Sequence, residues 1–123
     1  MKLILLVGVG SFAGGIFRHL LSSLVEGRTN QFPLGTFLVN LVGCFCIGCL
    51  LGIIERWQWS SEWRLFLITG LLGGFTTFSA FSAETLHLLK TGNISTAIIY
   101  VLGSILLGLG LAFLGSWIFR FSF

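Results

Sequence analysis

Four runs of apolar residues dominate this chain, and each is long enough to cross a membrane as a helix. A helix crosses the hydrocarbon core with about 20 residues. Only 9% of the 123 residues are charged, whereas soluble domains carry about 25% charged residues. Lipid must therefore be the solvent of this chain. We expect an all-α membrane protein with a single domain and transmembrane helices at about residues 3–25, 33–54, 63–89 and 94–119.

Charged residues are concentrated in the breaks between these runs and near the chain ends. An even number of spans puts both ends and the second break on one side of the membrane, and the bias of Lys and Arg sets the orientation. One side holds four basic residues and the other holds two, namely Lys2, Arg56, Arg64 and Arg120 against Arg28 and Lys90. This bias is weak, so insertion in one orientation and insertion in both remain open. No basic run is present that would attract nucleic acid.

The third run contains a long polar interruption, from Gly73 to Glu84. It combines a glycine pair, four hydroxyl side chains and a carboxylate within a segment of membrane length. Irregular backbone and polar groups survive at membrane depth only where they line a cavity, a pore or an ion site inside protein. We therefore expect the third helix to be broken near its middle, with Gly73 and Gly74 releasing carbonyls that suit a hard cation.

Small and polar residues also recur at every fourth position in the second and fourth runs, so they share one helix face in each. The two stripes are Thr36, Asn40, Cys44, Gly48 and Gly52, and Tyr100, Ser104, Gly108, Ala112 and Ser116. Taken singly, each stripe indicates helix–helix packing. Two stripes and a polar third run must face something in common, which favours a pore wall. Asn40 is accordingly either a hydrogen bond between helices or a donor to an anion.

Four further side chains could contribute to such a pore. Phe78 and Phe81 share a helix face, and their positive ring edges can stabilise an anion weakly, although packing is the commoner role of Phe. Glu84 continues that face and needs a partner, water or a proton. Arg18 either snorkels to the interface or lies near an anion vestibule. The sequence offers neither a set of metal ligands nor a pair of nucleophile and base. An enzyme is therefore the weakest interpretation.

Three segments of this chain resemble the signature segments of the Fluc (CrcB) family of fluoride channels. They are Gly14-Gly15-Ile16-Phe17-Arg18, residues 36–43 and residues 70–82, in the same order and in the expected spans. The resemblance covers essentially the whole chain. It implies an antiparallel, dual-topology homodimer that exports fluoride passively across the bacterial inner membrane through two pores. It also implies a structural Na⁺ at the dimer centre.

The resemblance further implies roles for particular residues. The backbone carbonyls of Gly73 and Thr76 from both subunits would hold the Na⁺. Glu84 would lie beside the pore, and Arg18 would be structural or vestibular. The anion pore would be lined by Asn40, Phe78, Ser79, Phe81, Tyr100 and Ser104.

Two other interpretations remain open at this stage. A small dual-topology multidrug transporter also has four short helices, but that family depends on a Glu in its first helix, and the first run here has none. A non-transporting subunit of a membrane assembly would use the two stripes only as packing seams.

Overall fold

The computed structural model describes residues 1–25 and 32–121, and Arg28 lies outside them. The described residues form helices and no strand. The helices are α1 (Lys2–Val25), α2 (Leu34–Trp57), α3 (Ser61–Arg64), the π-helix η1 (Leu65–Leu72), α4 (Gly73–Phe75), α5 (Phe78–Lys90) and α6 (Ile94–Phe121). Within this part of the chain, four segments are long and apolar enough to cross a membrane, namely Lys2–Val25, Leu34–Trp57, Ser61–Lys90 and Ile94–Arg120. The prediction of an all-α protein with four spans is confirmed.

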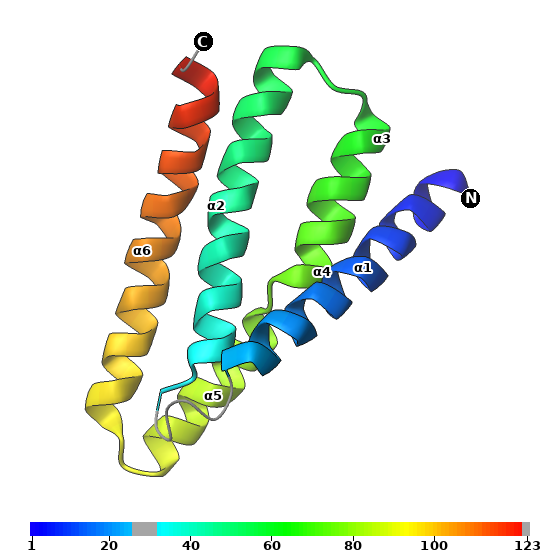
Figure 1. The fold of residues 1–123 in the computed structure, drawn as a ribbon. Coiled ribbons are helices and arrows are strands. Elements are labelled where there is room, and N and C mark those ends of the chain that lie inside the picture. Colours follow the sequence, from blue (N-terminus) through cyan, green and yellow to red (C-terminus); the bar gives the residue numbers. More distant parts are fainter. Residues whose placement is uncertain (26–31, 122–123) are drawn as a thin grey trace.

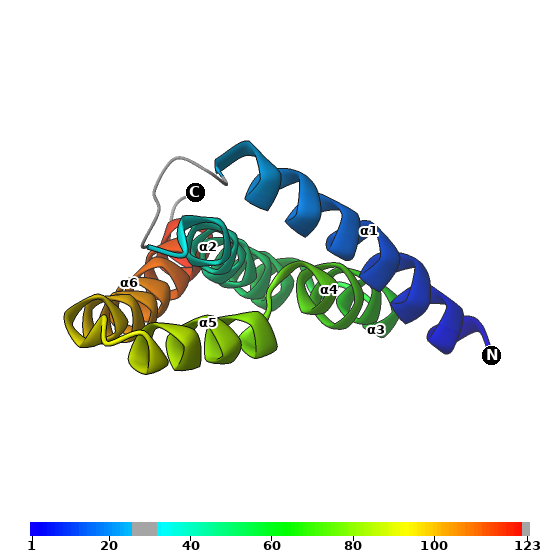
Figure 2. The same ribbon diagram turned by 90° about the horizontal axis from the view of Figure 1, so that it is seen from below.

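The chain runs up and down through the four spans (Figure 1). Helices α2 and α6 lie side by side, and α1 packs against η1 and α4. Seen from below, α1 and α6 lie on opposite sides of the bundle (Figure 2). Both chain ends and the turn between α2 and α3 lie at one end of the molecule. Two ion pairs connect elements there, because Lys2 Nζ is 2.8 Å from Glu62 Oε1 and Arg120 Nε is 3.8 Å from Glu55 Oε2.

Glycine allows the helix backbones to approach closely at two contacts that position the site. A Cβ atom on Gly48 of α2 would collide with the carbonyl oxygen of Ala112 in α6. A Cβ atom on Gly14 of α1 would collide with the carbonyl oxygen of Leu71 in η1. Lipid tails provide no hydrophobic force between helices, so close backbone packing of this kind supplies the attraction.

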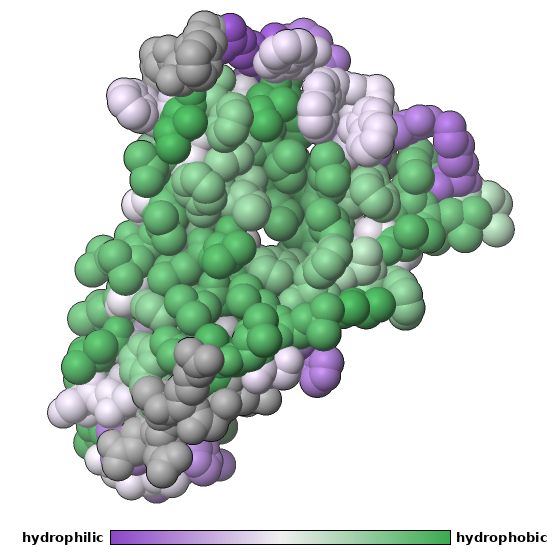
Figure 3. Space-filling model, in the orientation of Figure 1, coloured by the Kyte–Doolittle hydropathy of each residue, from purple (hydrophilic) through white to green (hydrophobic). Residues whose placement is uncertain are grey.

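The outer surface is suited to lipid. Figure 3 shows a broad hydrophobic zone between a polar upper end and a polar lower end. Large apolar side chains are exposed on the helices, including Phe12 of α1 and Phe113 of α6, which are 73% and 77% exposed. In water this surface would aggregate, so it belongs in the hydrocarbon of a bilayer or against another protein.

The third segment has three kinds of backbone along its length. Helices α3, η1 and α4 follow one another without interruption from Ser61 to Phe75. Thr76 and Thr77 are extended, with ψ of 157° and 120°, and α5 begins at Phe78. Gly73 and Gly74 themselves lie in α4. The extended residues follow the glycines by two positions.

Candidate anion site

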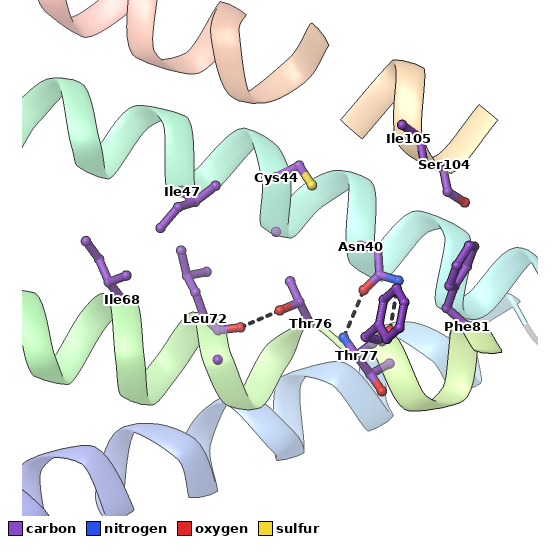
Figure 4. A pocket seen from close by; sticks show the side chains of 13 residues that line it. Asn40, Cys44, Ile47, Ile68, Leu72, Thr76, Thr77, Phe81, Ser104 and Ile105 are labelled. Atoms are coloured by element: carbon purple, nitrogen blue, oxygen red, sulfur yellow. Dashed lines mark hydrogen bonds between the residues drawn. The ribbon is translucent and has the colours of Figure 1, made fainter. Parts of the chain in front are cut away.

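A cavity of about 440 Å³ lies where α2, η1, α4, α5 and α6 meet. Its walls are mostly apolar, and polar groups enter from Asn40, Thr76, Thr77 and Ser104 (Figure 4). Six residues predicted to form the ion sites line it: Asn40, Gly73, Thr76, Phe78, Phe81 and Ser104. A mostly apolar cavity with a few convergent polar groups is the usual form of a small-ligand site.

Asn40 pairs with the backbone of Thr77 through both ends of its amide. Its Nδ2 donates to the Thr77 carbonyl at 3.1 Å, and its Oδ1 accepts from the Thr77 N–H at 2.9 Å. Asn40 therefore joins α2 to the extended backbone that precedes α5. Because a side-chain NH₂ group carries two N–H donors, one donor remains after this pairing. Asn40 also lines the cavity, so it can position α5 and donate to a ligand at the same time.

Two backbone carbonyls lose their helical donors to side chains at this point. In a continuous helix, Gly73 would accept from the Thr77 N–H and Thr76 from the Ala80 N–H. The Thr77 N–H donates instead to Asn40 Oδ1, and the Ala80 N–H donates to Thr77 Oγ1 at 3.3 Å. The carbonyls of Gly73 and Thr76 are consequently left available, and both residues line the cavity.

Ser104 lines the same cavity and carries an unsatisfied hydroxyl. Its Oγ is buried and has no hydrogen-bond partner within the described part of the chain. A buried polar group without a partner costs about 1–3 kcal/mol, so a ligand that bonds to this hydroxyl would remove that cost. A serine hydroxyl can donate to an anion or accept from water.

Aromatic rings form the end of the cavity next to Ser104. The rings of Phe78 and Phe81 are 5.6 Å apart, and Phe81 lies 5.1 Å from Tyr100. Phe81 is half-buried against α6, whereas Phe78 is 80% exposed. The positive edge of a phenyl ring attracts an anion, so both rings can contribute to anion binding within the cavity.

Glu84 and Tyr100 lie beyond this end and bond to each other. Tyr100 is fully buried, and its hydroxyl donates to Glu84 Oε2 at 2.7 Å. Thr36 Oγ1 donates to Glu84 Oε1, also at 2.7 Å. Hydrogen bonds to a carboxylate are short and strong, so this triad links α2, α5 and α6. The Tyr100 hydroxyl is engaged with Glu84, and Tyr100 is not among the residues that line the cavity.

Two other predicted residues lie outside the cavity wall. Ser79 is exposed, and its hydroxyl is 3.2 Å from Thr77 Oγ1. Arg18 is half-buried on α1, which packs against η1 and α4 on another side of the third segment. The structure of one chain therefore brings neither residue into contact with the cavity.

The two small-residue stripes turn out to have different surroundings along their length. Gly48 and Gly52 of α2 face the backbone at Ala112 and Ser116 of α6, which makes that half a packing seam. In the other half, Asn40 and Ser104 face the cavity. One half of the two stripes is thus a packing seam, and the other half lines the cavity.

Sequence reasoning did not assign a site role to three residues that the structure brings into the site. Thr36 bonds to Glu84, Cys44 lines the cavity, and Thr77 pairs with Asn40. The four-residue spacing on the second span could have identified Thr36 and Cys44. The pairing of Thr77 carries no signal in the sequence, because it joins residues that are 37 positions apart.

Comparison with known proteins assigns this chain to a protein family. Residues 5–116 match the family model described as CrcB-like protein, Camphor Resistance (CrcB). The chain belongs to the CrcB family. A relative from Oceanobacillus iheyensis is 46% identical over 116 residues, which cover 94% of this chain and 89% of the relative. A relative from Thermus thermophilus is 47% identical over 116 residues, covering 94% and 93%. Both CrcB relatives are named fluoride-specific ion channel FluC.

A third relative extends the match to nearly the full length of both chains. The protein from Phocaeicola vulgatus, also named fluoride-specific ion channel FluC, is 43% identical over 118 residues, covering 95% of this CrcB chain and 98% of the relative. The similarity therefore includes all four spans and the cavity described above.

Proposed function

We propose that this CrcB protein is a fluoride-selective channel that passively exports fluoride across the bacterial inner membrane. The observation that carries the proposal is the buried Ser104 hydroxyl, which has no partner among the described residues, in a mostly apolar cavity of a chain whose relatives are named fluoride-specific ion channels. Fluoride is small and strongly hydrated, so a pore must replace its water with fixed donors. The Ser104 hydroxyl, the second N–H of Asn40 and the ring edges of Phe78 and Phe81 are such donors.

The functional unit in this proposal is an antiparallel homodimer with two pores. Phe78 and Gly73 line the cavity and are exposed in a single chain, so a second copy would be needed to close the path from lipid. The weak bias of four basic residues against two is compatible with insertion in both orientations. Ser79 and Arg18, which lie away from the cavity in one chain, would contribute from the mouth of the pore. Glu84 and Tyr100 would lie beside the anion path and hold α5 against α6.

A structural Na⁺ at the centre of this dimer is part of the same proposal. The carbonyls of Gly73 and Thr76 have lost their helical donors to Asn40 and Thr77. Na⁺ is a hard cation that prefers oxygen ligands, and carbonyl oxygens of irregular backbone suit it. Two such carbonyls from each subunit fit this donor set. When bound, Na⁺ would supply positive charge beside the extended residues and neutralise their carbonyl dipoles.

The two rival functions are less well supported. A proton-coupled drug exporter requires a carboxylate that can exchange its proton, and α1 contains none. Glu84 accepts hydrogen bonds from Thr36 and Tyr100 on both oxygens. A subunit that serves only assembly would have no use for an unsatisfied hydroxyl inside a cavity.

Fluoride efflux from proteoliposomes tests the proposal. Vesicles loaded with potassium fluoride are treated with a potassium carrier, and external fluoride is followed with an electrode. We expect protein-dependent efflux that needs no proton gradient. Efflux that requires a proton gradient would contradict a channel, and so would vesicles that retain fluoride although they contain folded protein.

A further inference from the structure

A second hollow lies on the third segment, close to the end where the chain termini gather. It has a volume of about 380 Å³ and is lined by Ser61, Arg64, Leu65, Ile68 and Thr69. Trp59 and Trp63 lie next to it in the chain, with their rings 6.2 Å apart. Tryptophan marks the depth of the lipid headgroups, so this groove, which we call the Arg64 groove, opens at the membrane boundary.

Arg64 brings an uncompensated positive charge to this groove. Its side chain is exposed, and no carboxylate among residues 1–25 and 32–121 forms an ion pair with it. The carboxylates described by the structure are engaged elsewhere, Glu55 with Arg120, Glu62 with Lys2, and Glu84 with Thr36 and Tyr100. The nearby charges of Lys2 and Arg120 are thus balanced, and that of Arg64 is not.

The Arg64 groove adjoins the candidate anion site. Ile68 lines both the groove and the 440 Å³ cavity. Figure 4 shows Ile68 at one end of the cavity, with Ser104 and Phe81 at the other end. Arg64 precedes Ile68 by four residues, and Ile68 precedes Thr76 by eight residues. An anion held near Arg64 therefore lies at the end of the cavity opposite its aromatic end.

We propose that the Arg64 groove is the site where fluoride is captured from water before it enters the cavity. This inference rests on the proposed channel function. Arg64 would raise the local concentration of the anion, and the hydroxyls of Ser61 and Thr69 would replace part of its hydration shell. A fixed charge at the mouth of a low-dielectric cleft increases the rate at which ions of opposite sign arrive, and salt weakens the effect.

The phosphate of an anionic phospholipid is the alternative occupant, because it offers the same charge. Two features favour a path for a small ion. Ile68 lines both the groove and the cavity, and the Thr69 residue that lines the groove carries a hydroxyl. The two occupants differ in one measurable respect. A lipid contact depends on the lipid composition of the vesicle, whereas fluoride capture does not.

Efflux from vesicles of neutral lipid, with Arg64→Gln compared with wild type, tests the inference. We expect the initial rate to fall by about three- to tenfold at an ionic strength of about 0.01 M, and to approach the wild-type rate at about 1 M, where the screening length is only about 3 Å. Arg64→Lys should retain most of the rate. Arg120→Gln is the matched control, because it changes the net charge at the same end by the same amount but at a residue that does not line the groove, and it should conduct like wild type.

A reversal of charge separates electrostatics from folding. Arg64→Cys is made in a background with Cys46 and Cys49 replaced by Ser and Cys44 kept, and is labelled with a positive or a negative methanethiosulfonate reagent. The same background without Arg64→Cys, treated with the same reagents, is the control for labelling elsewhere. The positive label should restore efflux and the negative label should reduce it further. Equal effects of both labels, or a loss in Arg64→Gln that appears only in vesicles of anionic lipid, would overturn the inference. Both comparisons require that the wild-type protein conducts fluoride. A wild-type protein that does not conduct would contradict the channel function instead.

Discussion

At the scale of single residues, the site contains two donors in different states. The Asn40 amide donates one N–H to the Thr77 carbonyl and accepts the Thr77 N–H with its oxygen. It therefore has a structural role and keeps one N–H that can donate to a ligand. The Ser104 hydroxyl has no partner within the described residues, so its burial destabilises the fold unless a ligand bonds to it. Substitutions at Asn40 and Ser104 should therefore both reduce conduction, and the Ser104 substitution should do so without loss of stability.

Replacement of Asn40 by Asp should abolish fluoride flux. The carboxylate keeps an acceptor for the Thr77 N–H, but it removes both N–H donors and adds a negative charge to the cavity wall. A unit charge about 4 Å from the anion costs about 4 kcal/mol at an effective dielectric constant of about 20, so we expect a loss of roughly a hundredfold or more. The rate is measured per folded protein after size-exclusion chromatography. An Asn40→Asp protein that elutes and conducts like wild type would show that Asn40 does not face the anion.

Replacement of Ser104 by Ala should slow conduction without destabilising the protein. Removing the unpartnered hydroxyl relieves a burial cost, so the free energy of unfolding should stay equal or rise by about 1 kcal/mol. Flux should fall by about tenfold, because a hydrogen bond to a charged group is worth about 1.5–3 kcal/mol. Ser95→Ala, at an exposed position of the same helix, should change neither quantity. A Ser104 variant that unfolds more easily and conducts normally would mean that the hydroxyl serves packing.

At the scale of elements, the neighbours of the third segment determine where its backbone is extended. Asn40 of α2 takes the N–H of Thr77, and Thr77 Oγ1 caps the first turn of α5. On the other side, η1 packs so closely on α1 that Gly14 has no room for a side chain. A π-helix of eight residues is rare, and such geometry is frequent at functional sites.

Much of this arrangement could be predicted from the sequence, and the limits have a physical cause. The four spans are readable because apolar length alone specifies them, and the four-residue spacing indicates that Asn40 and Ser104 share faces with small residues. Which residues are extended could not be predicted. Glycine only allows the helix to end nearby, whereas the hydrogen bond from the Thr77 N–H to Asn40 fixes the position. The use of the Tyr100 hydroxyl by Glu84 likewise depends on packing between α5 and α6.

Replacement of Gly14 by Ala should loosen the contact between α1 and η1. The added methyl group meets the Leu71 carbonyl, and overpacking of this kind costs about 1–3 kcal/mol. Gly15→Ala is the matched control in the next position, where a Cβ meets no atom within 4 Å, and its effect should stay within about 0.5 kcal/mol. Thermal unfolding in detergent measures both. Equal losses at the two glycines would show that the close approach does not determine stability.

At the scale of the whole molecule, the cavity of one chain has exposed residues in its wall. The cavity is bordered by the exposed ring of Phe78 and the exposed backbone of Gly73. The proposed dimer would cover this face and bring the free carbonyls of two third segments together. Assembly, cation binding and conduction are then coupled, and removal of one should affect the others.

Removal of Na⁺ should weaken the dimer and stop fluoride flux. A ligand that binds only the assembled protein stabilises it by about 2.7 kcal/mol at a concentration a hundredfold above its Kd. Thermal stability should therefore rise with Na⁺ and not with a large organic cation at the same ionic strength. A protein purified without Na⁺ that keeps its dimer, its melting temperature and its flux would contradict a structural Na⁺ at the Gly73 and Thr76 carbonyls.

The most direct test of a fluoride-selective channel is a comparison of two halides in one preparation. Proteoliposomes loaded with equal amounts of fluoride and chloride are opened to potassium flow, and both anions are followed with electrodes as they leave. We predict that fluoride leaves rapidly while chloride is retained, because the cavity strips water from the ion and offers few, closely placed donors. Efflux of both anions at equal rates, or retention of both by folded protein, would contradict the account.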